Sequence, residues 1–234
     1  MSALLLLADS QLLFRPEQLP QLLRYCNRRV SNGAGHAVEK SAAEEAFRVQ
    51  GSATNKPLSA AYIGAANNNQ PEFFDFARSA LATLFGRPVP CHFIRSESDI
   101  PPAPCSLVIL AGGSVETGWA FLQRPAVRDW LEACRTDAGA VFIGVSAGAI
   151  HLASGCDPEQ PSPRAQTCLG WAPLFVAVHE EGENWPSLQV WRDAAATPDF
   201  SGMPFVGLPM GGGLWVENDA QEVVGKSALQ LSRP

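Results

Sequence analysis

One stretch of the chain, residues 140–150, constrains the fold more than any other. Its sequence, AVFIGVSAGAI, begins as a short apolar run rich in β-branched and aromatic residues and continues into small residues that suit a helix. Gly144 and Gly148 flank Ser146, and glycines there leave room for close backbone approach at a sharp turn. The pattern predicts a strand, a strained turn and a helix, with the Ser146 hydroxyl raised above the end of a sheet.

Apolar segments that suit buried strands alternate with segments of helical periodicity along most of the chain. We expect strands at residues 4–8, 60–64, 89–94, 106–110, 174–179 and 205–208, and helices at 16–29, 38–49, 125–134, 188–195 and from Pro71 onward. Residues 214–224 suit a β-hairpin that turns at Asn218 and Asp219. The whole, 1–234, is therefore predicted as one α/β domain with a mostly parallel sheet, helices on both faces and a C-terminal β-hairpin.

Composition narrows the classes of partner and cofactor. The net charge is −6 and no run is rich in Lys or Arg, which argues against nucleic acid and anionic membranes. The N-terminus lacks the positive flank of a signal peptide, and no apolar stretch is long enough to span a bilayer, so we expect a cytoplasmic protein. The six cysteines follow no metal-binding spacing and are expected to be reduced. No metal or organic cofactor is predicted.

Three chemically useful features are expected to meet at the carboxyl ends of the strands, where parallel sheets bind ligands. Ser146 ends one predicted strand. Gly112 and Gly113 end another and can present bare backbone N–H groups to a carbonyl oxygen. Among the four histidines, only His179 closes a predicted strand downstream of Ser146, as a general base for that hydroxyl should. Each feature also has a purely structural interpretation, namely a tight strand exit for the glycines and a histidine satisfied by a backbone carbonyl.

With these features in place, the chain resembles the aspartyl dipeptidases and cyanophycinases. These are serine peptidases on a class I glutamine-amidotransferase-like fold. The resemblance extends from the first strand to the hairpin and fails over about residues 15–57, which we interpret as a local elaboration. It rests on the order of five segments along the chain, namely LLLLADS (4–10), VILAGG (108–113), IGVSAGA (143–149), PLFVAVH (173–179) and FVGLPMG (205–211).

The resemblance implies an activity and a set of site residues. Ser146 would be the nucleophile and His179 its base, while the N–H groups of Gly113 and Ala147 would form the oxyanion hole. The substrate would be a small peptide. For the oligomeric state, a homodimer is left open. The residues expected to border the substrate pocket are Gly112, Asn67 and Trp185.

The chain departs from this family at the acid that orients the histidine. Aspartyl dipeptidases carry a Glu after the proline of the late Gly-Leu-Pro turn, where this chain has Met210. Cyanophycinases take the acid from the segment after the nucleophile, where this chain offers Asp157 and Glu159. The further candidates for this acid are Glu180, Glu181, Glu183 and Glu217, although a solvated loop charge is the favoured interpretation of each. The alternative function is therefore a catalytically impaired family member that acts as a binding or regulatory protein. A hydrolase with a cysteine nucleophile is disfavoured, because Ser146 occupies the turn. No arginine clearly matches the family's contact to an acidic substrate side chain.

Overall fold

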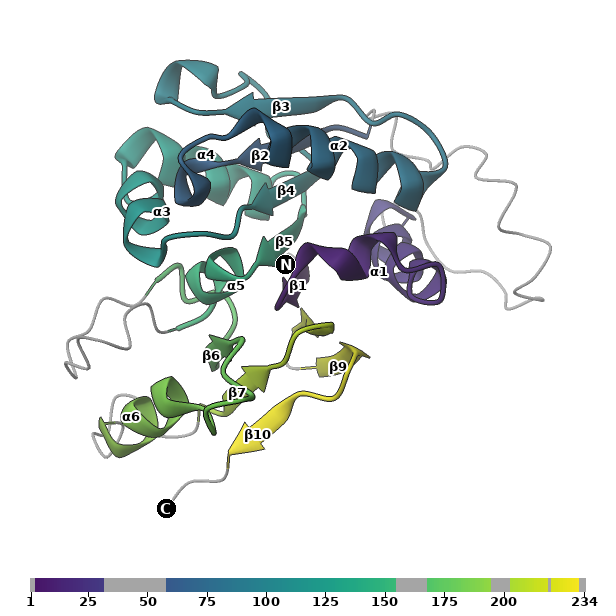
Figure 1. Cartoon of the computed structure of the whole chain (residues 1–234). Coiled ribbons are helices and arrows are strands. Elements are labelled where there is room, and N and C mark those ends of the chain that lie inside the picture. The colour runs from purple at the N-terminus through teal and green to yellow at the C-terminus, as the bar shows by residue number, and fades with distance from the viewer. Residues whose placement is uncertain (1–2, 32–57, 155–167, 195–202, 219, 232–234) are drawn as a thin grey trace.

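The computed structural model describes residues 3–31, 58–154, 168–194, 203–218 and 220–231 (Figure 1). The helix expected at 38–49, most of the elaboration expected at 15–57 and both acids expected after Ser146, Asp157 and Glu159, lie outside these ranges.

A seven-stranded sheet forms the centre of the molecule, in the order β3-β2-β4-β5-β1-β8-β9. The first five strands in that order pair in parallel, and β8 and β9 continue the sheet as an antiparallel pair beside β1. The predicted α/β architecture and the hairpin near Asn218 are thus confirmed. The strands of this sheet are β1 (Ala3–Leu7), β2 (Ala60–Ile63), β3 (Cys91–Ile94), β4 (Leu107–Leu110), β5 (Val141–Val145), β8 (Gly212–Glu217) and β9 (Ala220–Gly225).

Helices cover both faces of this sheet, because side chains that alternate along each strand feed two separate cores (Figure 1). On β1, Leu4 and Leu6 belong to one core, whereas Leu5 and Leu7 belong to the other. The helices α1 (Leu19–Ser31) and α2 (Pro71–Phe85) pack on the Leu5 side. On the Leu4 side lie α3 (Val115–Leu122), α4 (Pro125–Thr136) and α5 (Ala147–Leu152).

The sequence pattern did not distinguish α3, whose eight residues include Gly118. Its start is nevertheless coded locally, because the Ser114 hydroxyl accepts a hydrogen bond from the Thr117 N–H at 3.1 Å. A glycine inside a short helix weakens its periodic signal, and here it is needed for packing. A β-carbon at Gly118 would lie 2.4 Å from the His151 ring on α5.

A second, three-stranded sheet lies beside the first, with the order β10-β7-β6. It comprises β6 (Phe175–Val178), β7 (Phe205–Leu208) and β10 (Leu229–Leu231), and α6 (Pro186–Ala194) packs against it. The sequence pattern did not separate this sheet from the main one. Because β8 and β9 occupy the edge beyond β1, the strand β7 that precedes β8 pairs with β6 instead.

The cysteines depart in one respect from the expected reduced state. Within the described ranges, Cys26, Cys91, Cys105 and Cys134 are reduced, as predicted. Cys168 differs, because it is disulfide-bonded. Desolvation by burial raises the pKa of both Cys26 and Cys91 to about 12, so neither is a reactive thiolate at neutral pH.

No helix in the described part of the chain could cross a membrane.

Candidate active site

Ser146 occupies the predicted strained turn between β5 and α5. Its φ of 50° and ψ of −111° lie in a region that residues other than glycine rarely adopt. The turn is held in place because the Ser146 N–H donates to the Leu7 carbonyl on β1 at 2.8 Å. A strained non-glycine residue at a strand-to-helix turn is the geometry of a nucleophile elbow. The strained backbone is the strongest single sign of function in the structure.

The two glycines that flank Ser146 are required by the packing of the turn. A β-carbon at Gly144 would lie 2.4 Å from the carbonyl oxygen of Gly148. A β-carbon at Gly148 would lie 2.2 Å from the carbonyl oxygen of Leu110 on β4. Both contacts are with backbone, which cannot swing aside as a flexible side chain can. The spacing of these glycines is therefore set by the close approach of α5 to β4 and β5, as the sequence predicted.

Replacing Gly148 by alanine is expected to destabilise the fold by about 3 kcal/mol or more, the upper range for overpacking a core. The matched control is Gly182→Ala, where no atom would lie within 4 Å of the new β-carbon. Urea unfolding of the two variants and the wild type checks this. Equal unfolding midpoints for Gly148→Ala and the wild type would contradict the prediction, because they would show that the turn can accommodate a β-carbon beside the Leu110 carbonyl.

The two predicted oxyanion donors have backbone N–H groups available for a ligand. In the described part of the chain, neither the Gly113 N–H nor the Ala147 N–H donates to another backbone group. Two residues, one on either side of Gly113, do donate, since Ala111 donates to Ile63 and Ser114 donates to Ala66 at 2.8 Å. Gly113 has a φ of 130°, and a β-carbon there would lie 2.1 Å from the Ala66 carbonyl oxygen. Only glycine fits this strand exit.

His179 follows β6 directly, with an exposed side chain and a φ of 63°. Its backbone N–H donates to the Leu208 carbonyl at the end of β7, at 3.3 Å. No hydrogen bond joins its ring to the Ser146 hydroxyl in the described structure. Catalytic hydrogen bonds are often long without substrate and tighten when it binds.

The turn formed by residues 209–211 connects the Ser146 side of the site to the His179 side. Gly211 N–H donates to the Asp9 carboxylate at 2.5 Å, and Asp9 lies just after β1, to which Ser146 is hydrogen-bonded. On the other side, Met210 N–H donates to the Glu181 carboxylate at 3.0 Å. Glu181 lies two residues after His179. In the aspartyl dipeptidases, which the chain resembles, the acid that orients the histidine lies in this turn. Here the position is occupied by Met210, whose side chain is half-exposed.

Glu181 is an exposed carboxylate that accepts from Met210 N–H and lies two residues after His179. The hydrogen bond from Met210 N–H lowers the pKa of Glu181 most, and the charges of His179 and Lys226 lower it further. Its neighbour Glu180 has another role, because it accepts from the Ser187 N–H at 3.0 Å in the first turn of α6. The sequence leaves both as candidates for the orienting acid while favouring solvated loop charges, and Glu181 is exposed. The distinction depends on the 209–211 turn, which is remote in sequence.

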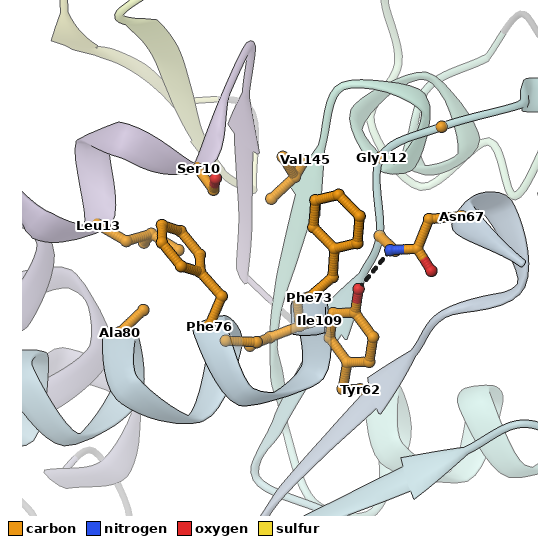
Figure 2. A pocket seen from close by; sticks show the side chains of 13 residues that line it. Ser10, Leu13, Tyr62, Asn67, Phe73, Phe76, Ala80, Ile109, Gly112 and Val145 are labelled. Carbon is orange, nitrogen blue, oxygen red and sulfur yellow. Dashed lines mark hydrogen bonds between the residues drawn. The ribbon is translucent and has the colours of Figure 1, made fainter. Parts of the chain in front are cut away.

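A cavity of about 230 Å³ opens beside the Ser146 turn, and both Asn67 and Gly112 line it (Figure 2). The Asn67 amide donates to the Tyr62 hydroxyl at 2.7 Å. Burial raises the pKa of Tyr62 to about 12, so this hydroxyl stays protonated at neutral pH. Trp185, also predicted to border the pocket, is not among the lining residues. It is buried against Gly207 on β7, in the core of the small sheet.

His151 is a second histidine near the turn, but it is buried within the packing of α3 against α5. Its Nε2–H donates to the Val115 carbonyl at 2.8 Å. Desolvation by burial lowers the pKa of His151, and the hydrogen bond to Val115 opposes this only in part. The ring is therefore neutral in the folded protein near neutral pH and has a structural role.

This burial predicts a pH dependence of stability. Below the ordinary pKa of 6.5, the unfolded chain protonates His151 while the folded chain resists. The part of the stability that depends on neutral His151 is fully present above pH 6.5. It is lost as the pH falls toward the pKa that His151 has in the folded protein. The free energy of unfolding should fall there by at most about 1.4 kcal/mol per pH unit. Urea unfolding of the wild type and His151→Gln on both sides of pH 6.5 checks this. Identical pH dependence in the two proteins would contradict it.

Among the described residues, no cluster of His, Cys, Asp or Glu side chains could hold a metal ion.

The chain matches no protein-family model and no curated protein. Solved structures do resemble it. One is a peptidase from an acI-B1 Actinobacterium, with a TM-score of 0.65, 14% identity, and coverage of 100% of this chain and 95% of that chain. Another is a putative peptidase E protein from Listeria monocytogenes EGD-e, with a TM-score of 0.56, 13% identity, and coverage of 97% and 100%. The chain thus shares its fold with these peptidase structures.

Proposed function

We propose that this protein is a serine-type peptidase or amidase of the aspartyl dipeptidase and cyanophycinase family, acting on a small peptide. The observation that carries the proposal is the backbone of Ser146, held at a φ of 50° on the turn between β5 and α5. Such strain persists only where the surrounding structure imposes it, and it clusters at active sites. The available N–H groups of Gly113 and Ala147 support the same conclusion.

The proposed reaction follows from these groups. The Ser146 Oγ attacks the scissile carbonyl carbon while His179 accepts the hydroxyl proton. The oxygen of the tetrahedral intermediate is stabilised by the Gly113 and Ala147 N–H groups. His179 then transfers the proton to the leaving amine, and the acyl group remains on Ser146. Water, deprotonated by His179, hydrolyses this ester and restores the free hydroxyl.

A serine-reactive fluorophosphonate tests the proposal directly. We expect one adduct, on Ser146, in the wild type and none in Ser146→Ala. The exposed Ser79 on α2 provides the matched control, because Ser79→Ala should label as the wild type does. Labelling at other serines alone would reject Ser146 as the nucleophile.

We also propose that Glu181 replaces the family's missing acid and positions His179. Two observations support this: its place two residues from His179 and its hydrogen bond to Met210 N–H. A carboxylate at this place holds the imidazole in the orientation needed to accept the Ser146 proton. Because the pKa of Glu181 is lowered, the acid stays ionised even in mildly acidic solution.

Replacing Glu181 by glutamine is expected to lower kcat by up to about 10⁴-fold, the loss found when an orienting carboxylate becomes an amide. KM should change little. The control is Glu183→Gln, the same change at an exposed position in the same segment. Met210→Glu should restore part of the activity of Glu181→Gln, because it returns a carboxylate to the turn. A kcat for Glu181→Gln equal to that of Glu183→Gln would leave Asp157 and Glu159 as the remaining candidates.

The alternative, a binding or regulatory protein with an impaired site, is favoured by Met210 at the turn. Peptide binding without turnover in the wild type, together with turnover gained in Met210→Glu, would support it. The cytoplasmic location and the homodimer remain predictions, as does the absence of nucleic-acid and membrane partners.

A further inference from the structure

The cavity beside the Ser146 turn has an unusually apolar wall. Among the residues that the structure describes, its polar lining side chains are Ser10, Tyr62 and Asn67, and none of the lining residues is Lys, Arg, Asp or Glu. Two phenylalanines of α2, Phe73 and Phe76, extend toward it although they are 51% and 45% exposed (Figure 2). Large apolar side chains left in water around a concave site indicate a surface that binds another apolar group.

This cavity adjoins the proposed catalytic centre, although Ser146 itself does not line it. Val145, one of its lining residues, directly precedes Ser146. Gly112, another, lies so close that a β-carbon there would be 3.2 Å from the Ser146 β-carbon. Gly113, a proposed oxyanion donor, also lines it. A carbonyl group placed over Ser146 would therefore have one of its substituents at the cavity mouth.

The position of His179 indicates which substituent this is. His179 must protonate the leaving amine, so the amine lies on the side of β6 and the 209–211 turn. The cavity lies elsewhere, because its lining comes from β2, β4, β5, α2 and the segments around Ser10 and Asn67. No lining residue belongs to β6, β7 or the 209–211 turn. The substituent at the cavity is therefore the acyl part of the substrate.

We propose that this cavity binds the side chain of the residue whose carbonyl is attacked, and that this side chain is large and apolar. The inference rests on the proposed function and adds the class of substrate. The volume suits an aromatic or long aliphatic side chain, since an apolar cavity of about 150 Å³ already accepts benzene. An acidic side chain would lose its hydration there without gaining a cationic partner from the wall.

The first arm of the test compares aminoacyl p-nitroanilides of Phe, Leu, Ala and Asp, which share one leaving group. We expect kcat/KM for the Phe and Leu compounds to exceed that for Ala by about 100-fold, the discrimination typical of an apolar pocket. The Asp compound should be the poorest. Equal rates for Phe and Ala, or a preference for Asp, would overturn the pocket assignment while leaving the peptidase assignment intact.

Two variants connect the preference to the cavity. Ala77→Leu adds bulk at a lining position of α2 and should reduce the Phe-to-Ala ratio by about tenfold or more. Ala82→Leu makes the same change on the same helix at a position that does not line the cavity, and should leave the ratio unchanged. Phe73→Ala changes an exposed side chain, so the fold should tolerate it, and it too should lower the ratio. Unchanged ratios in both Ala77→Leu and Phe73→Ala would exclude this cavity.

A binding arm separates the two proposals. Ser146→Ala is titrated calorimetrically with Phe-Ala and Ala-Ala dipeptides, and Phe-Ala should bind at least about tenfold more tightly. If the wild type hydrolyses nothing but this preference holds and disappears with Ala77→Leu, the cavity assignment stands and the peptidase proposal fails. If the wild type hydrolyses substrates without preference, the cavity assignment fails alone. Neither hydrolysis nor preferential binding would overturn both.

Discussion

Replacing Ser146 by alanine is expected to lower kcat by about 10⁶-fold. A nucleophile and its base act as one catalytic unit, so the loss of the nucleophile removes the contribution of both. The backbone should stay in place, since the Ser146 N–H, rather than its side chain, holds the turn to Leu7. Hydrolysis of the Phe p-nitroanilide and urea unfolding measure the two quantities. The unfolding midpoint should change little, so that the loss of activity reports the hydroxyl group alone. Turnover in Ser146→Ala equal to that of the wild type would remove the nucleophile assignment.

Replacing His179 by alanine is expected to be about as damaging, and adding Ser146→Ala to it should cost little more. Residues that act as one catalytic unit are strongly non-additive. Because His179 has a φ of 63°, a conformation that asparagine adopts more readily than alanine, His179→Asn is the better variant for isolating the lost base.

The matched control for the base is His92→Ala, at an exposed position on β3. It should retain wild-type turnover. If His179 were structural only, both His179 variants would lose stability, whereas the remaining folded protein would keep its kcat. Turnover is therefore compared per folded molecule.

Local sequence patterns predicted the elements of the site well. The Ser146 turn was predictable because its strain and its close contacts require small residues at fixed spacing, and Gly144 and Gly148 show that spacing. The Gly113 strand exit was predictable for the same reason. The start of α2 was marked by Pro71, which occupies its first turn as expected. Each of these features depends on residues a few positions apart.

The sequence could not assign the acid or the pocket. Glu180 and Glu181 are adjacent and chemically identical, yet one accepts from Ser187 on α6 and the other from Met210. Trp185 likewise looked suited to a pocket wall, but Gly207 leaves a space on β7 that its ring fills. In both cases the partner lies on a segment that only folding brings close.

The amino-acid order by itself therefore determined the α/β architecture, the strained turn at Ser146 and the glycines that surround it, because backbone sterics act over short spans of chain. The tertiary structure alone decided that β6 and β7 form a separate sheet and that the 209–211 turn connects Asp9 to Glu181. It also decided that an apolar cavity adjoins the Ser146 turn. These features arise from contacts between distant segments, whose pairing is set by the packing of whole elements and leaves no periodic trace in any one of them.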